Sequence, residues 1–375
     1  MKLLIAGDFC PNNRVVSLIE NGEYERIFGH VANVIQSADY SIVNFETTIA
    51  NSSDKPIKKC GPALCTKSYA IDALAYAGFD CCTLANNHFK DFGEEGIMRS
   101  ISELEKKHFD YFGAGSNLYE AQKVLIKEIN HKKIAFINCC EHEFSKATDK
   151  QAGCKPLDPI SLYYSIKEAK ELADFVIMII HGGLEHIQVP QIRMKRLYHF
   201  FVDIGVDVII NHHQHCVNGM EVYNNKPIFY GLGNFCFDWE GKIHSIWNVG
   251  YMVKLNISNT IDYEVVPYSQ CDDKPCVRLL EGKEKKSFEI EFKRLSDLIS
   301  DDAAIAKNYD DFLTNNITRY KYIFEPYWGR LGAKLYSRKL LPSFAKIRST
   351  TKLNFIECES HREMLISLLN KLIIK

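Results

Sequence analysis

The chain repeats one pattern of apolar and polar positions. A short apolar run, rich in β-branched residues, ends abruptly at Asp, Glu, Asn or His. Runs of this length, bounded by polar residues, predict buried β-strands. The predicted strands that follow this pattern are Leu3–Ala6, Tyr40–Phe45, Phe79–Ala85, Ile134–Cys140, Phe175–Ile180, Val206–Ile210 and Pro227–Leu232.

Between most of these runs lie segments whose apolar residues are three and four positions apart, the spacing of an amphipathic helix. These segments are Glu23–Ser37, Ser68–Ala77, Glu94–Lys107, Ser161–Ala173 and Gln191–Asp203. Alternating strands and helices predict an α/β fold whose sheets are buried on both faces. Ligands in such folds bind beyond the carboxyl ends of the strands, where the polar residues that end each run would converge.

The pattern changes after Asn234. Val249–Ile257 and Ile261–Tyr268 read as consecutive strands joined by the polar turn Ser258–Thr260. We therefore predict a hairpin here, and we expect it to close a second sheet.

The length of 375 residues exceeds the ~250–300 that one core usually serves. We predict a main domain at 1–270, a segment at 271–300 that completes or flanks it, and an extension at 301–375. Within the middle segment, Glu281–Lys286 reads as a turn-like break and Phe288–Ile299 as a helix. The extension is expected to be mostly helical and aromatic. It is also basic, because it holds 13 Lys and Arg against 8 Asp and Glu.

Composition and charge bear on the partners and the cellular location expected of this protein. A chain with 46% hydrophobic and 25% charged residues and a net charge of -1 is an ordinary globular protein, with nothing that favours nucleic acid or membrane partners. The apolar start stops at Gly7-Asp8, too early for a signal peptide, and no apolar stretch approaches the ~20 residues of a transmembrane segment. The 13 cysteines then fit reduced thiols in a cytoplasmic protein.

The most informative stretch is Asn211–His215, Asn-His-His-Gln-His. Three imidazoles crowded at one strand end need a compensating partner, and a metal ion supplies one. If the backbone stays extended, His213 and His215 project to the same side while His212 faces away. Taken alone, the stretch also fits a His-rich surface loop.

The polar ends of other strands offer further donor atoms. The segments concerned are Gly7-Asp8, Asn44-Phe45-Glu46, Asn86–Gly93, His181–Glu185 and Gly231–Phe235. Carboxylates, an amide oxygen and imidazoles together suit Zn, Mn or Fe rather than Ca. A pair of such metals needs a bridging carboxylate and ligands from several strand ends, and this set provides both.

Each of these residues also fits a plainer role when it is taken singly. Asp8 fits a turn residue or a helix N-cap, Glu46 a solvated carboxylate and Asn87 a turn cap. His88 and Asp91, three positions apart, fit a local ion pair.

Other polar residues near the strand ends leave their roles open. Glu185 fits a residue that orients His181 or positions substrate, and equally an exposed loop acid. Glu141 and His142 read as a structural pair at a strand end. Cys10, two residues after Asp8, reads as a small buried residue rather than a thiolate facing the site.

The order and spacing of these motifs resemble the CapA family of bacterial capsule synthesis proteins, also called the poly-γ-glutamate capsule family, which is similar to the calcineurin-like metallophosphatases. The family pattern contains Gly-Asp, Asn-Leu-Glu, Asn-His-x-x-Asp-x-Gly, His-x-Gly-x-Glu, His-Pro-His and Ser-Leu-Gly-Asn-Phe. It matches Gly7-Asp8, Asn44–Glu46, Asn87–Gly93, His181–Glu185, His213–His215 and Gly231–Phe235, within roughly residues 1–270.

The resemblance implies a four-layer αββα sandwich with a two-metal centre at its loop ends. By position, Asp8 and His215 would hold the first metal, and Glu46 would bridge to the second. The second metal would also be held by Asn87, His181 and His213.

The remaining motif residues would act on substrate. The resemblance makes His88, oriented by Asp91, a general acid or oxyanion stabiliser. It places Asn44, Glu185 and Asn234 against the substrate or behind the ligands.

The resemblance also implies a function. The chain would be a metal-dependent hydrolase or transferase of capsule or cell-surface polymer synthesis, in which metal-activated water attacks a phosphoester or related linkage. Its partners would be an anionic polymer or phosphorylated substrate and other capsule-synthesis proteins. Two alternatives stay open: a general cytoplasmic metallophosphoesterase, and a non-catalytic, metal-stabilised scaffold of the polymer machinery.

The chain departs from its relatives at several points. Cys10 stands where the metallophosphatases have a His, which bears on the first metal position. Gln214 replaces the Pro of His-Pro-His, and the N-terminal membrane anchor of many relatives has no counterpart here. Residues 301–375 lie outside the resemblance.

Overall fold

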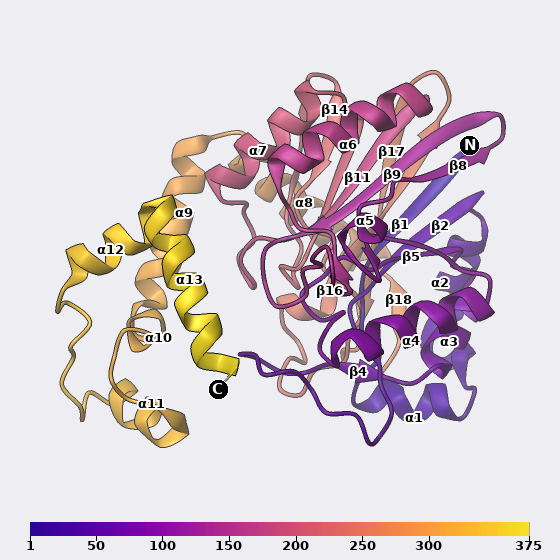
Figure 1. Ribbon diagram of the computed structural model, residues 1–375. Helices are drawn as coiled ribbons and strands as arrows, with labels where there is room; N and C mark the ends of the chain where they lie inside the picture. Colours follow the sequence, from indigo (N-terminus) through magenta and orange to yellow (C-terminus); the bar gives the residue numbers. More distant parts are fainter. Residues whose placement is uncertain (375) are drawn as a thin grey trace. The chain divides into compact units, whose positions relative to one another are not determined.

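The computed structural model describes residues 1–374. The chain divides into two compact units, Met1–Ala306 and Lys307–Lys375. The predicted boundaries at residues 270 and 300 stay predictions. Figure 1 shows the elements of both units in sequence colours.

Two large sheets form the first unit. The eight-stranded sheet has the order β18-β17-β16-β1-β2-β5-β6, with β15 beside β1, and the six-stranded sheet has the order β13-β14-β12-β11-β9-β8. The strands of the first sheet are β1 (Lys2–Phe9), β2 (Tyr40–Phe45), β5 (Cys81–Thr83), β6 (Asp110–Phe112), β15 (Asn234–Cys236), β16 (Val249–Ile257), β17 (Ile261–Gln270) and β18 (Val277–Leu279). Those of the second are β8 (Leu125–Ile129), β9 (Lys132–Cys140), β11 (Phe175–His181), β12 (Val208–His212), β13 (Met220–Tyr223) and β14 (Lys226–Phe229).

Helices cover the outer face of each sheet. Their apolar stripes make one core against the first sheet and another against the second. The helices on the first sheet are α1 (Arg14–Glu20), α2 (Tyr24–Gln36), α3 (Tyr69–Ala77) and α4 (Gly93–Lys106), and those on the second are α6 (Pro159–Leu172) and α7 (Ile192–Asp203). Shorter elements are β3 (Thr48–Ile49), β4 (Cys65–Thr66), β7 (Ala114–Gly115), α5 (Leu118–Ala121), β10 (Gly153–Cys154) and the 3-10 helix η1 (Ile246–Asn248).

Strand alternation explains the layers. In β1, Leu3 and Ile5 pack into the core between the sheets, whereas Leu4 and Ala6 pack under the outer helices. Successive side chains of a strand point to opposite faces, so a continuous apolar run can serve two cores. The predicted α/β class and four-layer αββα sandwich are confirmed.

The hairpin prediction needs one correction. Its strands β16 and β17 form as expected, but β16 pairs antiparallel with β1. The hairpin therefore extends the sheet that begins with β1 instead of closing the other one. The free edge of β1 decides this, since Lys2 to Ile5 have their backbone groups available for pairing on that side.

A second correction concerns the predicted break at Glu281–Lys286. Helix α8 (Gly282–Ile299) already begins there, because Glu and Lys are good helix formers and a glycine at the first position costs the helix little. Phe288 and Leu295 of α8 then pack into the core between the sheets.

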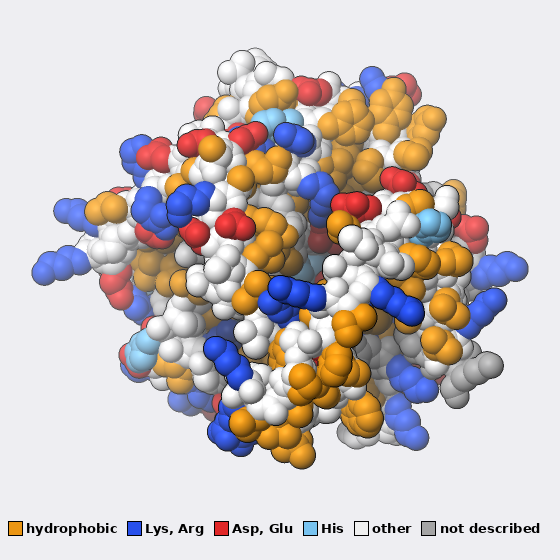
Figure 2. All heavy atoms as spheres, turned by 90° about the vertical axis from the view of Figure 1, so that its left-hand side faces the viewer, with side chains coloured by type: hydrophobic (Ala, Val, Ile, Leu, Met, Phe, Trp, Pro, Cys, Tyr) orange, Lys and Arg blue, Asp and Glu red, His pale blue; other side chains and the backbone are white. Residues whose placement is uncertain are grey.

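The second unit is helical, as predicted. Helix α9 (Asp302–Asn315) leads into it, followed by α10 (Ile317–Tyr322), α11 (Gly329–Ser337), α12 (Ser349–Glu357) and α13 (Glu359–Ile374). Its internal contacts centre on the Glu325 carboxylate, which accepts hydrogen bonds from the Tyr336 hydroxyl at 2.8 Å and the Phe344 amide at 2.6 Å. Many apolar side chains stay exposed, Trp328 at 87%, and Figure 2 shows a face where hydrophobic side chains lie among Lys and Arg.

No helix within residues 1–374 is long and apolar enough to cross a membrane. All thirteen cysteines are free thiols. The cytoplasmic location stays a prediction.

Phe136 tests the core between the sheets. Its ring is fully buried. The ring centroid lies 6.0 Å from that of Tyr40 and 5.9 Å from that of Phe112, and both of these residues belong to the other sheet. We expect Phe136→Ala to lower the free energy of unfolding by ~3–5 kcal/mol, measured by urea titration. Tyr164→Ala, on the exposed side of α6, is the control and should change it by less than ~0.5 kcal/mol. An equal effect of both substitutions would contradict this packing.

Candidate metal centre

Asp8 lies near the carboxyl end of β1, where the strand is pressed against Gly233. A Cβ at Gly7 would lie 2.0 Å from the Gly233 carbonyl oxygen, so only glycine permits this approach. Asp8 Oδ1 accepts a hydrogen bond from Asn44 Nδ2 at 2.8 Å and lies 3.2 Å from His212 Nδ1. Burial by itself raises the pKa of Asp8, but the neighbouring His212, together with His181 and His215, holds that pKa below its ordinary value. Asp8 is therefore ionised.

Glu46 directly follows β2 and is fully buried. Both of its carboxylate oxygens lack a hydrogen-bond partner within residues 1–374. Oε1 lies 3.6 Å from His181 Nε2 and 3.8 Å from His215 Nε2. Burial, and next the charge of Asp8, raise the pKa of Glu46 well above its ordinary value. A bare ionised carboxylate is unfavourable here, and a cation between these groups would remove that cost.

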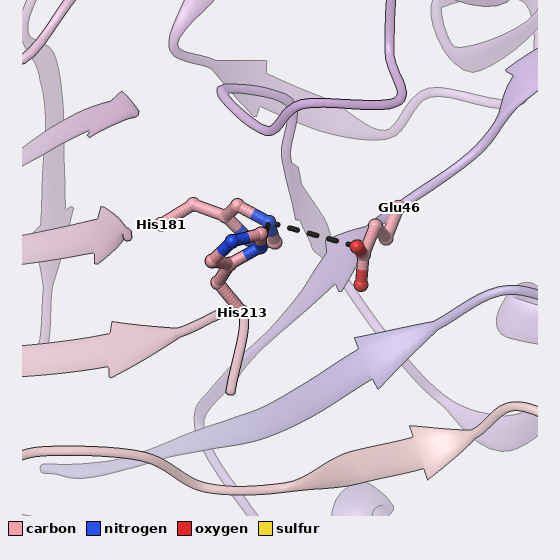
Figure 3. A group of neighbouring side chains, drawn as sticks. All are labelled: Glu46, His181 and His213. Carbon is pink, nitrogen blue, oxygen red and sulfur yellow. Dashed lines mark hydrogen bonds and ion pairs between the residues drawn. The ribbon is translucent and has the colours of Figure 1, made fainter. Parts of the chain in front are cut away.

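His181 ends β11 and faces Glu46 from the other sheet. Its Nε2 lies 3.0 Å from Asn87 Oδ1 and 3.0 Å from His213 Nδ1. Burial, and next the nearby His213, lower the pKa of His181 well below its ordinary value, so the ring is neutral and able to act as a ligand. Figure 3 shows the rings of His181 and His213 and the Glu46 carboxylate pointing toward one another.

The histidine stretch reaches the site in a way that extended geometry does not predict. Strand β12 ends at His212, and His213 and His215 have φ of 97° and 55°, so the chain turns there. Both rings face the centre as expected, but His212 does not face away, since it lies against Asp8. The expectation for His212 is wrong because the two-residue period of a strand stops where the turn begins.

Donor atoms gather into groups that share residues. The ligand atoms of Asp8, Glu46 and His215 lie within 4.8 Å of one another, as do those of Glu46, His181 and His213. Glu46 belongs to both groups, which is the geometry of a bridging carboxylate between two metals. An orphaned buried carboxylate beside neutral imidazoles fits a pair of divalent transition metals.

Two amide side chains hold the ligands in place. Asn44 joins Asp8 to His181 Nδ1, at 3.3 Å. Asn234 Oδ1 lies 2.9 Å from His215 Nδ1, which leaves His215 Nε2 toward Glu46. Both amides act on the ligand residues from behind, as such partners do in metal sites.

His88 lies beside this centre with its orientation fixed. Asn86 Oδ1 accepts the His88 amide hydrogen at 3.1 Å, in a turn that holds the buried residues Asn87 and His88. His88 Nδ1 lies 2.7 Å from Asp91 Oδ2, and the buried Asp91 carboxylate also accepts the Leu64 amide hydrogen at 2.7 Å. Asp91 thus orients the ring of His88, and the catalytic role of the pair stays a prediction.

Sequence reasoning missed Lys59. Its side chain is only 5% exposed; its ammonium pairs with Asp91 Oδ1 and lies 3.2 Å from His88 Nδ1. Lys59 comes from the polar loop between β3 and β4, where neither periodicity nor a motif marks it. Lys59 and Asp91 are 32 positions apart, so only the fold brings them together.

The remaining predicted residues lie at the rim or behind the centre. The Glu185 side chain is 45% exposed, and its carboxylate gathers with His213 and His215. Glu141 accepts the Gly183 amide hydrogen at 3.1 Å and pairs with Arg193, which agrees with its structural interpretation. Cys10 packs against Leu64, Phe237 and Trp247; burial raises the pKa of its thiol well above the ordinary value, and the charge of Glu46 adds to this.

Comparison with known proteins identifies the family. The model of the bacterial capsule synthesis protein PGA_cap family matches residues 2–239. The chain belongs to this family. It is 31% identical over 275 residues to the PGA biosynthesis protein CapA of Bacillus subtilis, covering 70% of this chain and 69% of that protein.

Further relatives agree with this assignment. The capsule biosynthesis protein CapA of Bacillus anthracis is 30% identical over 246 residues, which is 64% of this chain and 60% of that protein's length. Among solved structures, a novel phosphatase from Mycoplasma pneumoniae is 16% identical, with 73% of this chain and 95% of that chain covered and a TM-score of 0.48. A TM-score this low adds nothing to the family assignment.

Glu46 gives a test of the centre without metal. Because its folded pKa is raised, the metal-free native state keeps a proton that the unfolded chain releases, so this residue makes stability fall as pH rises through the folded pKa. We expect Glu46→Gln, which cannot ionise at this side chain, to remove the contribution of Glu46 to the fall of the unfolding free energy with rising pH. Urea unfolding of chelator-treated protein at pH 7 and pH 9, above the titration of unfolded histidine (pKa ~6.5), measures it. An unchanged difference between the two pH values would contradict the buried, unpaired state of Glu46.

Proposed function

We propose that this protein is a dinuclear metal-dependent hydrolase that acts in the synthesis of capsule or another cell-surface polymer, poly-γ-glutamate or polysaccharide. The observation that carries the proposal is the buried Glu46 carboxylate, unpaired and shared by both donor groups. The proposed process, capsule or polymer synthesis, is taken from the names of the relatives. The match covers 60% and 69% of the length of the two CapA relatives. The activity and partners of those full-length proteins are therefore only proposals for this chain.

The proposed ligands follow from the two donor groups. Asp8, Glu46 and His215 would hold one cation, and Glu46, His181, His213 and Asn87 would hold the other. Mn, Zn or Fe suits this mixture of nitrogen and oxygen atoms. Two such cations, when bound, supply a lowered water pKa and positive charge for the oxygens of a phosphoryl or related group.

The protein's own residues supply the proton chemistry. Asp91 accepts the Nδ1 hydrogen of His88, which fixes the ring and leaves Nε2 free to hold or release a proton at a leaving-group oxygen. Lys59 pairs with the other oxygen of Asp91 and keeps that carboxylate in place. We therefore propose a phosphorylated precursor or an anionic polymer as substrate, with other capsule-synthesis proteins as partners and the cytoplasm as location.

Metal binding is the first test. Protein stripped with chelator and titrated with Mn²⁺ or Zn²⁺ should bind about two ions per chain, measured by calorimetry and elemental analysis. Asp8→Ala and His213→Ala should each abolish hydrolysis of bis(p-nitrophenyl) phosphate, since each removes a ligand from a different position. Circular dichroism should show that both variants remain folded. A wild-type protein that binds no metal would refute the centre.

His88 is the second test. We expect His88→Asn to lower kcat ~10²–10⁴-fold while the metal stoichiometry stays that of the wild type, because His88 holds a proton and not a metal. His131→Asn, at an exposed turn, is the matched control and should leave kcat unchanged. Metal binding with no turnover of the phosphodiester or of poly-γ-glutamate by the wild type would instead favour the scaffold alternative.

A further inference from the structure

The first metal position is short of one side-chain donor. It offers Asp8, Glu46 and His215, whereas the second offers Glu46, His181 and His213 together with the Asn87 oxygen. Cys10 follows Asp8 at the place where the sequence departs from its wider superfamily. Within residues 1–374, no group of clustered donors includes the Cys10 sulfur, and its side chain packs into an apolar cluster with Phe237 and Trp247.

Glu185 approaches the same position from the open side. It follows the Gly182-Gly183 turn at the end of β11, and its carboxylate lies within 4.8 Å of ligand nitrogens of both His213 and His215. Its side chain is 45% exposed, and Oε2 lies 3.9 Å from His186 Nε2. His215 therefore has donors on both sides, Asp8 and Glu46 within the core and Glu185 at the mouth.

Glu143 provides a natural comparison at the same rim. Its Oε1 lies 3.7 Å from His213 Nε2, and its side chain is 40% exposed. Unlike Glu185, it shares no donor group with His215. The two glutamates thus have similar exposure and differ in their relation to the first position.

We propose that Glu185 is a metal ligand of the first position, bound from the solvent side in place of the imidazole that Cys10 does not provide. The inference rests on the proposed two-metal centre and assigns one of its ligands. The Glu185 carboxylate, with 45% of its side chain exposed beside His213 and His215, would supply the further donor.

The test compares Glu185→Gln with Glu143→Gln in the full chain, titrated with Mn²⁺ alone by calorimetry after chelation. The wild type should bind about two ions. Glu185→Gln should bind one ion normally and the other ~10–100-fold more weakly, whereas Glu143→Gln should match the wild type. Both positions are exposed, so neither change should alter the circular dichroism spectrum.

Loading the protein with Co²⁺ tests whether Cys10, instead of Glu185, binds the metal. If Glu185 completes the site, the Co²⁺ protein should show no thiolate-to-metal charge-transfer band, and its visible bands should change in Glu185→Gln. Wild-type affinities for both ions in Glu185→Gln would overturn the proposal. A charge-transfer band that disappears in Cys10→Ser would overturn it in favour of Cys10. Failure of the wild type to bind any metal would overturn the two-metal centre itself, a result distinct from both.

Discussion

The structure of the site depends on one electrostatic constraint: two carboxylates are buried side by side where the ends of two sheets meet. Asp8 is stabilised as an anion by an amide and by imidazoles, whereas neither carboxylate oxygen of Glu46 has a hydrogen-bond partner within residues 1–374. Burial of an unpaired carboxylate next to another negative charge is among the least favourable arrangements in a protein interior. The two cations proposed above would offset this cost, and the neighbouring imidazoles of His181 and His215 would be among their ligands.

The packing of the four layers brings those groups together. Asp8 lies one residue before the end of β1 and Glu46 directly follows β2 in one sheet, whereas His181 ends β11 and His213 follows β12 in the other. Because β1 is parallel to β2, and β11 to β12, the polar ends lie at the same edge of each sheet. Packing of the two sheets on a common apolar core fixes the distance between the edges, and the strand ends together with the turns that directly follow them set the positions of the donor side chains.

Around this rigid centre the chain places groups that are easier to vary. Asp91 links the ring of His88 to the loop that carries Lys59 and Leu64, so one carboxylate holds all three residues together. Glu185 and Glu143 remain exposed beside the imidazoles. Substitutions at these rim positions would leave the buried strands undisturbed.

The pattern of residues along the chain was enough to predict the α/β class and the kinds of donor atom at the strand ends, and the family resemblance implied the four layers. Apolar runs that serve two cores must form buried strands, and the polar residues that end them must then lie at a sheet edge. The tertiary structure alone decided three other features: the sheet that the β16–β17 hairpin joins, the inward position of His212, and the approach of Lys59 to Asp91. Each depends on pairing between segments far apart in the chain or on a turn at positive φ, and the local spacing of apolar and polar residues contains no information about either.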